Sequence, residues 1–203
     1  MIRLHFNEII YRNYNNETIE YGIINGNKTI VLIKCGYNGT IRGFNDKYIK
    51  IGYLLNEKYG YTIICSSNPF NGNVDSIQDA IDLINTKYQE YVIYYIGNSI
   101  AATIGAKYGY KYPSIKKMLL INGPLIFNSD KVVYGLKQFN QESIDLIYGS
   151  LDSSIRYIEM INLCYNTKVR YHILEGINHN FENKLDIFIN LPEKYLLKGE
   201  DHE

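Results

Sequence analysis

The chain has 203 residues and a formal net charge of zero, because 21 Lys and Arg residues balance 21 Asp and Glu residues. Hydrophobic residues make up 46% of it and charged residues 21%, values that exclude a disordered or low-complexity chain. The chain therefore has no excess of positive charge of the kind that favours binding to nucleic acid or an anionic membrane. A chain of this length can bury a full core without disulfides or metals, so we expect one domain over residues 1–203.

No apolar run approaches the ~20 residues that span a bilayer, and residues 1–8 lack the uninterrupted apolar core of a signal peptide. The three cysteines, Cys35, Cys65 and Cys164, are widely spaced and form no CxxC pair. This pattern argues against a disulfide framework or a zinc site and favours buried free thiols. We therefore expect a cytoplasmic protein without a metal.

Strand-like segments recur along the chain, first as alternating and then as nearly continuous apolar runs. They cover residues 2–12, 19–24, 29–34, 61–65, 92–96, 118–121, 145–148 and 170–174. The continuous runs are typical of strands that are covered on both faces. Asn25-Gly26, between the second and third segments, predicts a tight hairpin.

Segments of helical length lie between the later strands, at residues 45–58, 75–88, 100–109, 130–140, 153–165 and 182–197. Two or three antiparallel strands followed by repeated strand–helix units predict an α/β fold. We expect a mostly parallel central sheet of about eight strands with helices on both faces. The charged tail, residues 198–203, is expected to fray.

The first candidate for chemistry follows strand 92–96, where residues 97–102 read Gly-Asn-Ser-Ile-Ala-Ala. Active residues of a parallel sheet collect at the carboxyl ends of its strands. Small residues two positions before and after Ser99 suit a sharp strand-to-helix turn that lifts the hydroxyl above the sheet. Taken alone the signal is weak, since a chain with 16 Gly contains a Gly-x-Ser about once by chance, and Ser99 would then be an ordinary N-cap.

Two further strands end in residues that suit a nucleophilic serine. Strand 145–148 runs into residues 149–152 (Gly-Ser-Leu-Asp), and strand 170–174 runs into residues 175–181, which contain His179. A serine hydroxyl needs a histidine to take its proton, and the histidine needs a carboxylate to fix its tautomer. Because Ser99, Asp152 and His179 each follow a strand end, we expect them to converge at one edge of the sheet.

Donors for an oxyanion are expected from backbone N–H groups beside Ser99. Strand 29–34 is followed by residues 35–40 (Cys-Gly-Tyr-Asn-Gly-Thr), whose glycines permit a turn that aims N–H groups inward. The helix after Ser99 contributes its own amino end, which favours developing negative charge. The backbone N–H groups of Tyr37 and Ile100 are the natural pair.

These segments together resemble a small α/β-hydrolase fold protein, over nearly the whole chain. The turn at Ser99 resembles the Gly-x-Ser-x-Gly of that family, and the loops ending in Asp152 and His179 resemble its acid and histidine loops. The resemblance implies Ser99 as nucleophile, His179 as base and Asp152 as orienting acid, with no metal or organic cofactor. The family has His-Gly after its third strand, where this chain has Cys35-Gly36. That departure leaves open a second class of function, a non-catalytic protein of the same fold that binds a ligand or a partner.

Other histidines and carboxylates are weighed against this assignment. His5 lies in the first strand, His172 inside the last strand and His202 in the tail, where packing or solvation is the simpler interpretation. Asp130 is the rival acid, because some relatives place the acid after strand 118–121, although it could simply cap the next helix. Asp145 begins its strand and therefore lies at the wrong edge of the sheet.

The sequence thus predicts a cytoplasmic serine hydrolase, a carboxylesterase or thioesterase in kind, that cleaves a small ester, thioester or amide through an acyl-enzyme. Larger relatives insert a lid between strands 118–121 and 145–148, but this chain has room there for one helix only. We expect an open, shallow site for a small acyl substrate, with walls from residues 66–72 and 124–127. The oligomeric state is left open.

Overall fold

The computed structural model describes residues 4–126 and 129–197. Three predictions fall partly or wholly outside these ranges. They concern the start of the first strand, Phe127 of the predicted pocket wall and the predicted frayed tail, residues 198–203.

An eight-stranded sheet forms the centre of the molecule, with the strand order β1-β2-β4-β3-β5-β6-β7-β8. β1 and β2 pair antiparallel with their neighbours, and all other pairs are parallel. The mostly parallel sheet confirms the prediction from the strand–helix alternation. The strands are β1 (Glu8–Tyr14), β2 (Glu17–Ile24), β3 (Thr29–Lys34), β4 (Thr62–Ser66), β5 (Val92–Asn98), β6 (Ile115–Ile121), β7 (Ser143–Gly149) and β8 (Val169–Leu174).

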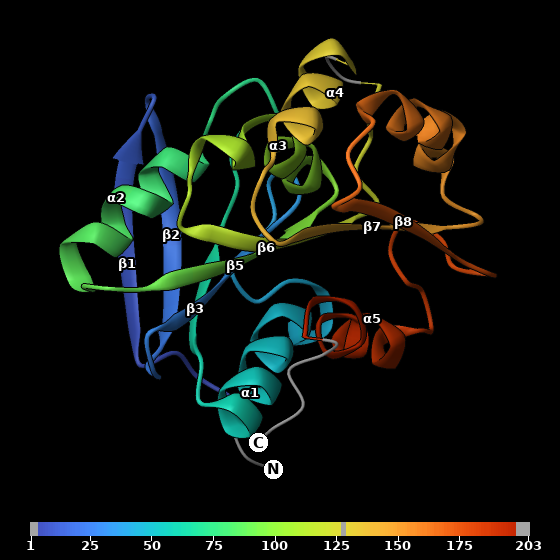
Figure 1. Ribbon diagram of the computed structural model, residues 1–203. Coiled ribbons are helices and arrows are strands. Elements are labelled where there is room, and N and C mark those ends of the chain that lie inside the picture. The colour runs from blue at the N-terminus through green and yellow to red at the C-terminus, as the bar shows by residue number, and fades with distance from the viewer. Residues whose placement is uncertain (1–3, 127–128, 198–203) are drawn as a thin grey trace.

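Helical segments cover both faces of the sheet (Figure 1). One face carries α1 (Lys47–Tyr59) and α5 (Leu185–Leu191), and the other carries α2 (Ile77–Lys87), α3 (Ile100–Tyr108), α4 (Ser129–Gln138) and the 3-10 segment η3 (Ser153–Cys164). Short helical segments complete the chain, namely η1 (Phe44–Asp46), η2 (Gly109–Lys111) and the π-helical turn η4 (Pro192–Leu196).

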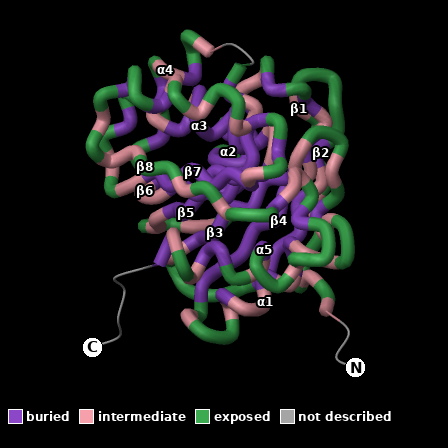
Figure 2. Tube along the Cα trace, turned by 90° about the vertical axis from the view of Figure 1, so that its right-hand side faces the viewer, coloured by how far each residue is buried: buried purple, intermediate pink, exposed green. Residues whose placement is uncertain are grey.

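Alternate residues of each central strand belong to two separate hydrophobic cores. In β3, Ile30 and Leu32 face the core shared with α2, α3 and α4, whereas Val31 and Ile33 face the core shared with α1 and α5. This alternation explains why the strand reads as a continuous apolar run, since both of its faces are covered. Figure 2 shows the buried residues concentrated along the central strands and the exposed residues on the surrounding helices and loops.

The predicted hairpin at Asn25-Gly26 is wrong, because β2 pairs with β1 and β4 rather than with β3. The tight turn instead lies at Asn15 and Asn16, with φ values of 48° and 64°, between the paired residues Tyr14 and Glu17. Two successive positive φ values are those of the hairpin turn whose twist matches the strands. Gly26 has a different role, since an added Cβ there would lie 2.4 Å from the carbonyl oxygen of Gly60.

Two of the predicted helices differ in kind from the expectation. Residues 153–165 form the 3-10 segment η3 rather than an α-helix, and 182–197 contains α5 followed by η4. The boundary between α5 and η4 falls at Pro192, which has no backbone N–H to donate to the preceding turn. Within the described ranges, no helix has both the length and the apolar character of a bilayer span.

Lys34, at the end of β3, is fully buried. Its ammonium group donates to Ser66 Oγ at 3.1 Å and to the carbonyl oxygen of Ser67 at 3.4 Å. Burial disfavours the charged form and lowers the pKa of Lys34 from its ordinary value of 10.5 to about 8. The folded protein therefore carries a desolvated charge below pH 8.

Lys34→Met is expected to raise the free energy of unfolding at pH 7 by about 3 kcal/mol, because it removes that desolvated charge. Ser66 and Ser67 still pair, since Ser66 Oγ donates to Ser67 O at 2.9 Å. The gain must shrink as the pH rises from about 8 to 10.5, the interval in which the folded parent loses the proton that the unfolded chain retains. Urea unfolding of both proteins at pH 7 and pH 10 measures this, and an equal difference at the two pH values would contradict the assignment.

Candidate active site

Ser99 occupies a sharp turn between β5 and α3, with φ 56° and ψ −123°. Positive φ is a strained conformation for a residue with a Cβ, and such strain is found at functional sites. Gly97 makes the turn possible, because an added Cβ there would lie 2.7 Å from the carbonyl oxygen of Ala101. The Ser99 N–H donates to Ile121 O at 2.8 Å, which ties the turn to the end of β6.

The structure brings Ser99, His179 and Asp152 into a chain of contacts. His179 Nε2 lies 3.1 Å from Ser99 Oγ, and His179 Nδ1 lies 2.7 Å from Asp152 Oδ2. With Nδ1–H donated to the carboxylate, Nε2 is left to accept the proton of the serine hydroxyl. These distances are within the reach that proton transfer between a nucleophile and its base requires.

The carboxylate of Asp152 is buried, whereas the side chain of His179 is partly exposed. The side chain of Asp152 is 1% exposed and that of His179 is 43% exposed. The second carboxylate oxygen, Asp152 Oδ1, accepts the backbone N–H of Ser154 at 2.9 Å, so that Asp152 also caps η3. An Asp side chain that accepts the backbone N–H two residues on is a common local turn, and the residue type at position 154 does not signal it.

The loops that carry Asp152 and His179 are bonded to each other along their length. Leu151 N donates to Ile177 O at 3.0 Å, and Gly176 N donates to Ser150 Oγ at 2.9 Å. The two backbones also lie close together at Gly149, where an added Cβ would lie 2.1 Å from Ile177 O. The acid and histidine loops therefore form one unit.

The loop after β3 lies directly against the serine. A Cβ added to Gly36 would come within 3.2 Å of Ser99 Cβ, so glycine permits this close approach. Tyr37, the next residue, has a half-exposed side chain, and Ile100 begins α3 on the other side of Ser99. Backbone N–H groups in the first turn of a helix have no acceptor within that helix.

Cys35 stands where the resemblance led us to expect a histidine that braces this loop. Burial raises the pKa of the Cys35 thiol to about 12, so it remains protonated. The thiol lies 2.9 Å from Thr40 O and donates to it. A backbone bond from Asn38 N to Asn68 O, at 2.8 Å, fixes the loop from the other side. The loop is thus held in place without the histidine.

Comparison with solved structures decides the fold. Est1E from Butyrivibrio proteoclasticus matches with a TM-score of 0.73 at 12% identity, over 93% of this chain and 97% of that chain. The chain has the α/β-hydrolase fold. An alpha-beta serine hydrolase homologue from Coxiella burnetii matches with a TM-score of 0.72 at 15% identity, over 96% and 100% of the two chains. No protein-family model matches the chain, and no curated protein matches it in sequence.

A lidless member of the α/β-hydrolase fold is also similar. It is a serine hydrolase from Xanthomonas campestris, with a TM-score of 0.68, 11% identity and 92% coverage of each chain. In this chain, the described residues between β6 and β7 contain one helix, α4. The prediction of an α/β-hydrolase fold without a lid domain is confirmed.

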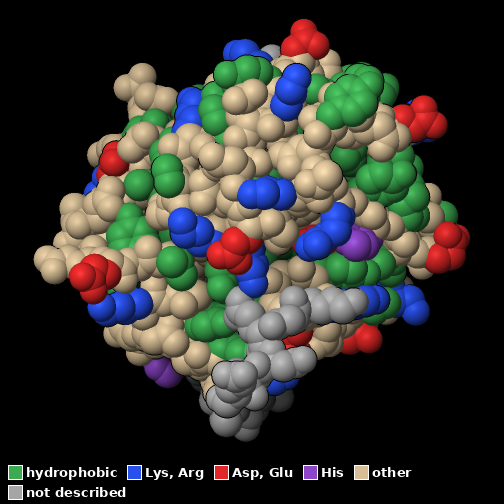
Figure 3. Space-filling model, in the orientation of Figure 1, with side chains coloured by type: hydrophobic (Ala, Val, Ile, Leu, Met, Phe, Trp, Pro, Cys, Tyr) green, Lys and Arg blue, Asp and Glu red, His purple; other side chains and the backbone are tan. Residues whose placement is uncertain are grey.

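The other carboxylates and histidines considered in the sequence lie elsewhere. Asp130 is exposed in the first turn of α4, and it is Asp152 that contacts His179. Asp145 lies at the amino half of β7, where it bonds Arg170 at 2.7 Å and His172 at 2.8 Å. Among the residues that the structure describes, no cluster of three or more His, Cys, Asp or Glu is suited to hold a metal. Figure 3 shows positive and negative side chains interspersed over the face in view.

A cavity of about 270 Å³ adjoins His179 and Asp152. Pro124 and Ile126 line it, as predicted for residues 124–127, but the opposite wall comes from η3 rather than from the loop 66–72. The η3 residues that line the cavity are Ser153, Ser154, Arg156 and Tyr157.

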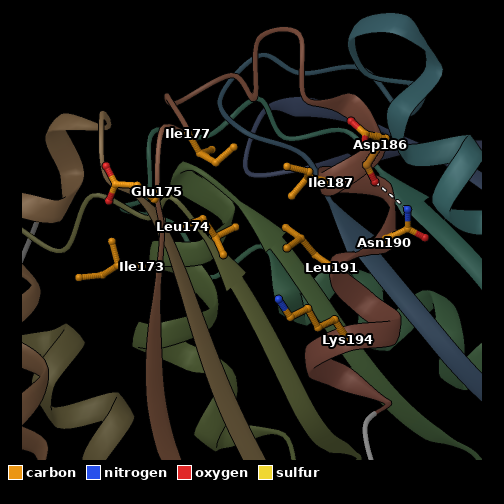
Figure 4. A pocket seen from close by; sticks show the side chains of 9 residues that line it. All are labelled: Ile173, Leu174, Glu175, Ile177, Asp186, Ile187, Asn190, Leu191 and Lys194. Carbon is orange, nitrogen blue, oxygen red and sulfur yellow. Dashed lines mark hydrogen bonds between the residues drawn. The ribbon is translucent and has the colours of Figure 1, made fainter.

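A larger cavity, of about 460 Å³, lies between β8 and α5, and Figure 4 shows Ile177, Ile187 and Leu191 around it. None of the three residues in the Ser99 chain of contacts lines it.

Proposed function

We propose that this protein is a serine hydrolase that cleaves a small ester, thioester or amide with Ser99 as its nucleophile. The observation that carries the proposal is the unbroken chain of contacts from Asp152 through His179 to the Ser99 hydroxyl. The strained turn at Ser99 and the α/β-hydrolase fold support it. The fold alone would not suffice, because one scaffold hosts many activities.

The proposed reaction begins when Ser99 Oγ attacks the substrate carbonyl and its proton passes to His179 Nε2. Asp152 holds the Nδ1–H of His179 and stabilises the imidazolium that forms. The backbone N–H groups of Tyr37 and Ile100 donate to the tetrahedral oxyanion. The tetrahedral intermediate then collapses and the bond from its central carbon to the leaving group breaks. His179 gives its proton to the departing group, and an acyl-enzyme remains on Ser99.

The second half of the reaction returns the enzyme to its starting state. A water molecule attacks the acyl carbonyl while His179 Nε2 accepts its proton. The tetrahedral intermediate collapses, the bond to Ser99 Oγ breaks, and the proton on His179 returns to that oxygen. The acid product leaves, and no cofactor takes part.

A short acyl group is the substrate class that the surroundings favour. The cavity beside His179 has about 270 Å³, below the range of about 300–1,000 Å³ that drug-sized ligands occupy. The histidine side chain is 43% exposed, and one helix stands where a lid domain would be inserted. A long alkyl chain would therefore remain largely in water.

A panel of p-nitrophenyl esters with acetyl, butyryl and palmitoyl chains, together with a short-acyl thioester, tests this function. We expect the palmitoyl ester to exceed the butyryl ester in kcat/KM by no more than about twofold, since the cavity gives the long chain little burial and hence little extra binding. Turnover no faster than in buffer for every member would contradict the hydrolase. A larger preference for the palmitoyl ester would contradict the substrate class.

A further inference from the structure

Asn122 follows directly after β6 and is fully buried. Its φ of 49° lies in the left-handed region, which asparagine tolerates better than most residues with a side chain. The backbone N–H donates to Ile147 O at 2.8 Å, which extends the pairing of β6 with β7 by one residue. This backbone bond fixes Asn122 at the carboxyl end of β6, next to the candidate active site.

The side-chain amide of Asn122 bonds both loops that carry triad residues. Its Oδ1 accepts the N–H of Gly149, the last residue of β7 and the one from which the acid loop starts, at 3.0 Å. Its Nδ2 donates to the carbonyl oxygen of His179 at 3.1 Å and to that of Asn178 at 3.4 Å. One buried amide therefore connects the start of the acid loop to the backbone of the catalytic histidine itself.

The end of β6 consequently contacts all three active-site loops. Ile121 O accepts the N–H of Ser99, and the neighbouring Asn122 side chain holds the other two loops. The bond to Gly149 is buried and the two bonds to the histidine loop are partly buried, so an unpaired carbonyl or N–H there costs more than one fully exposed to water. A change in the Asn122 amide would therefore move the imidazole relative to the serine before it unfolded the domain.

We infer that Asn122 is a positioning residue that sets the place of His179 between Ser99 and Asp152, an inference that rests on the proposed hydrolase function. It does not touch the reacting atoms. Its amide supplies a donor for the histidine loop and an acceptor for the acid loop, a combination that an ionised aspartate or a glycine does not supply.

Asn122→Asp is the sharpest test, because it retains the size and the acceptor for Gly149 N–H but loses both donors to the histidine loop. Asn122→Gly is the second variant, since glycine adopts the φ of 49° without strain and removes every side-chain bond. Asn166 offers a matched control. Its Nδ2 likewise donates to two carbonyls, Leu136 O and Phe139 O, its Oδ1 accepts Lys168 N–H, and it precedes β8 at the far edge of the sheet.

We expect Asn122→Asp to lower kcat for p-nitrophenyl butyrate by about 10- to 100-fold with KM within about twofold, because the imidazole is misplaced while the substrate cavity is intact. The ring ¹H and ¹⁵N shifts of His179 should change in the same variant. Asn166→Asp should leave kcat and these shifts at the parent values, even where it lowers the thermal midpoint. If Asn122→Asp does not fold, Asn122→Gly is judged by the same measurements.

Parent values of both kcat and the His179 ring shifts in the Asn122 variants would overturn the inference. An equal loss of kcat in Asn166→Asp would overturn it as well, because the effect would then be general destabilisation. If the parent shows no Ser99-dependent turnover, the proposed function fails, and the ring shifts alone then decide whether Asn122 positions His179.

Discussion

Ser99→Ala is expected to lower kcat for p-nitrophenyl butyrate by about 10³- to 10⁶-fold while the fold is retained. The variant keeps the Cβ that packs beside Gly36 but loses the oxygen that His179 Nε2 faces at 3.1 Å. Without that oxygen no acyl-enzyme forms, and only the residual effect of binding and oxyanion stabilisation remains. Steady-state kinetics and circular dichroism on the same preparation measure the two parts of this prediction.

Ser67→Ala is the matched control for this loss. Ser67 also follows a strand end, that of β4, but its hydroxyl accepts the N–H of Glu20 at 2.8 Å rather than facing a histidine. Its kcat should remain within about twofold of the parent, since a change away from the reacting atoms leaves transition-state binding intact. Equal rates for Ser99→Ala and Ser67→Ala would mean that Ser99 is not the nucleophile.

Asp152→Asn is expected to lower kcat by about 10²- to 10⁴-fold, because the amide no longer fixes the tautomer of His179 or stabilises its cation. The carboxylate oxygen that accepts His179 Nδ1–H at 2.7 Å is lost, although the side chain keeps its size. Initial rates of the parent and of Asp152→Asn, measured from about pH 6 to about pH 9, test this loss.

Asp130→Asn distinguishes the two acids that the sequence left open. Asp130 is exposed in the first turn of α4, so its replacement should leave kcat unchanged and at most weaken the start of that helix. A loss of activity in Asp130→Asn, with Asp152→Asn near the parent rate, would contradict the pairing of His179 with Asp152.

Much of the fold followed from sequence because its central strands are apolar on both faces and helices alternate with them. The convergence of Ser99, Asp152 and His179 could be anticipated for a related reason. Parallel strands end at one edge of the sheet, so residues just after three such strands must lie near one another. The candidate residues could therefore be anticipated from their order and spacing, whereas the role of each was implied by the resemblance to the α/β-hydrolase family.

The features that could not be predicted from the sequence depend on contacts between distant segments. Asn25-Gly26 has the composition of a hairpin turn, yet β2 pairs with β4 instead of β3, and Gly26 serves a close contact with Gly60. Asn122 has no local signature, because its three side-chain bonds reach loops that lie far along the chain. Such bonds exist only once the strands are assembled.

Only one wall of the cavity beside His179 was predicted, because the other wall also depends on contacts between distant segments. Residues 124 and 126 line the cavity as expected, whereas the loop 66–72 is occupied by other contacts. The carbonyl oxygen of Asn68 accepts a hydrogen bond from Asn38 N–H, and that of Gly72 accepts one from the ammonium group of Lys107. The segment η3 forms that wall instead, and its first turn is capped by Asp152.

Covalent labelling with a fluorophosphonate, followed by peptide mass mapping, tests most directly whether Ser99 is an activated nucleophile. We expect one adduct, on Ser99, and a labelling rate at least about 10²-fold lower in His179→Gln, because the imidazole that accepts the hydroxyl proton at 3.1 Å is gone. An adduct on a different residue, no adduct at all, or equal labelling rates for the parent and His179→Gln would contradict this account.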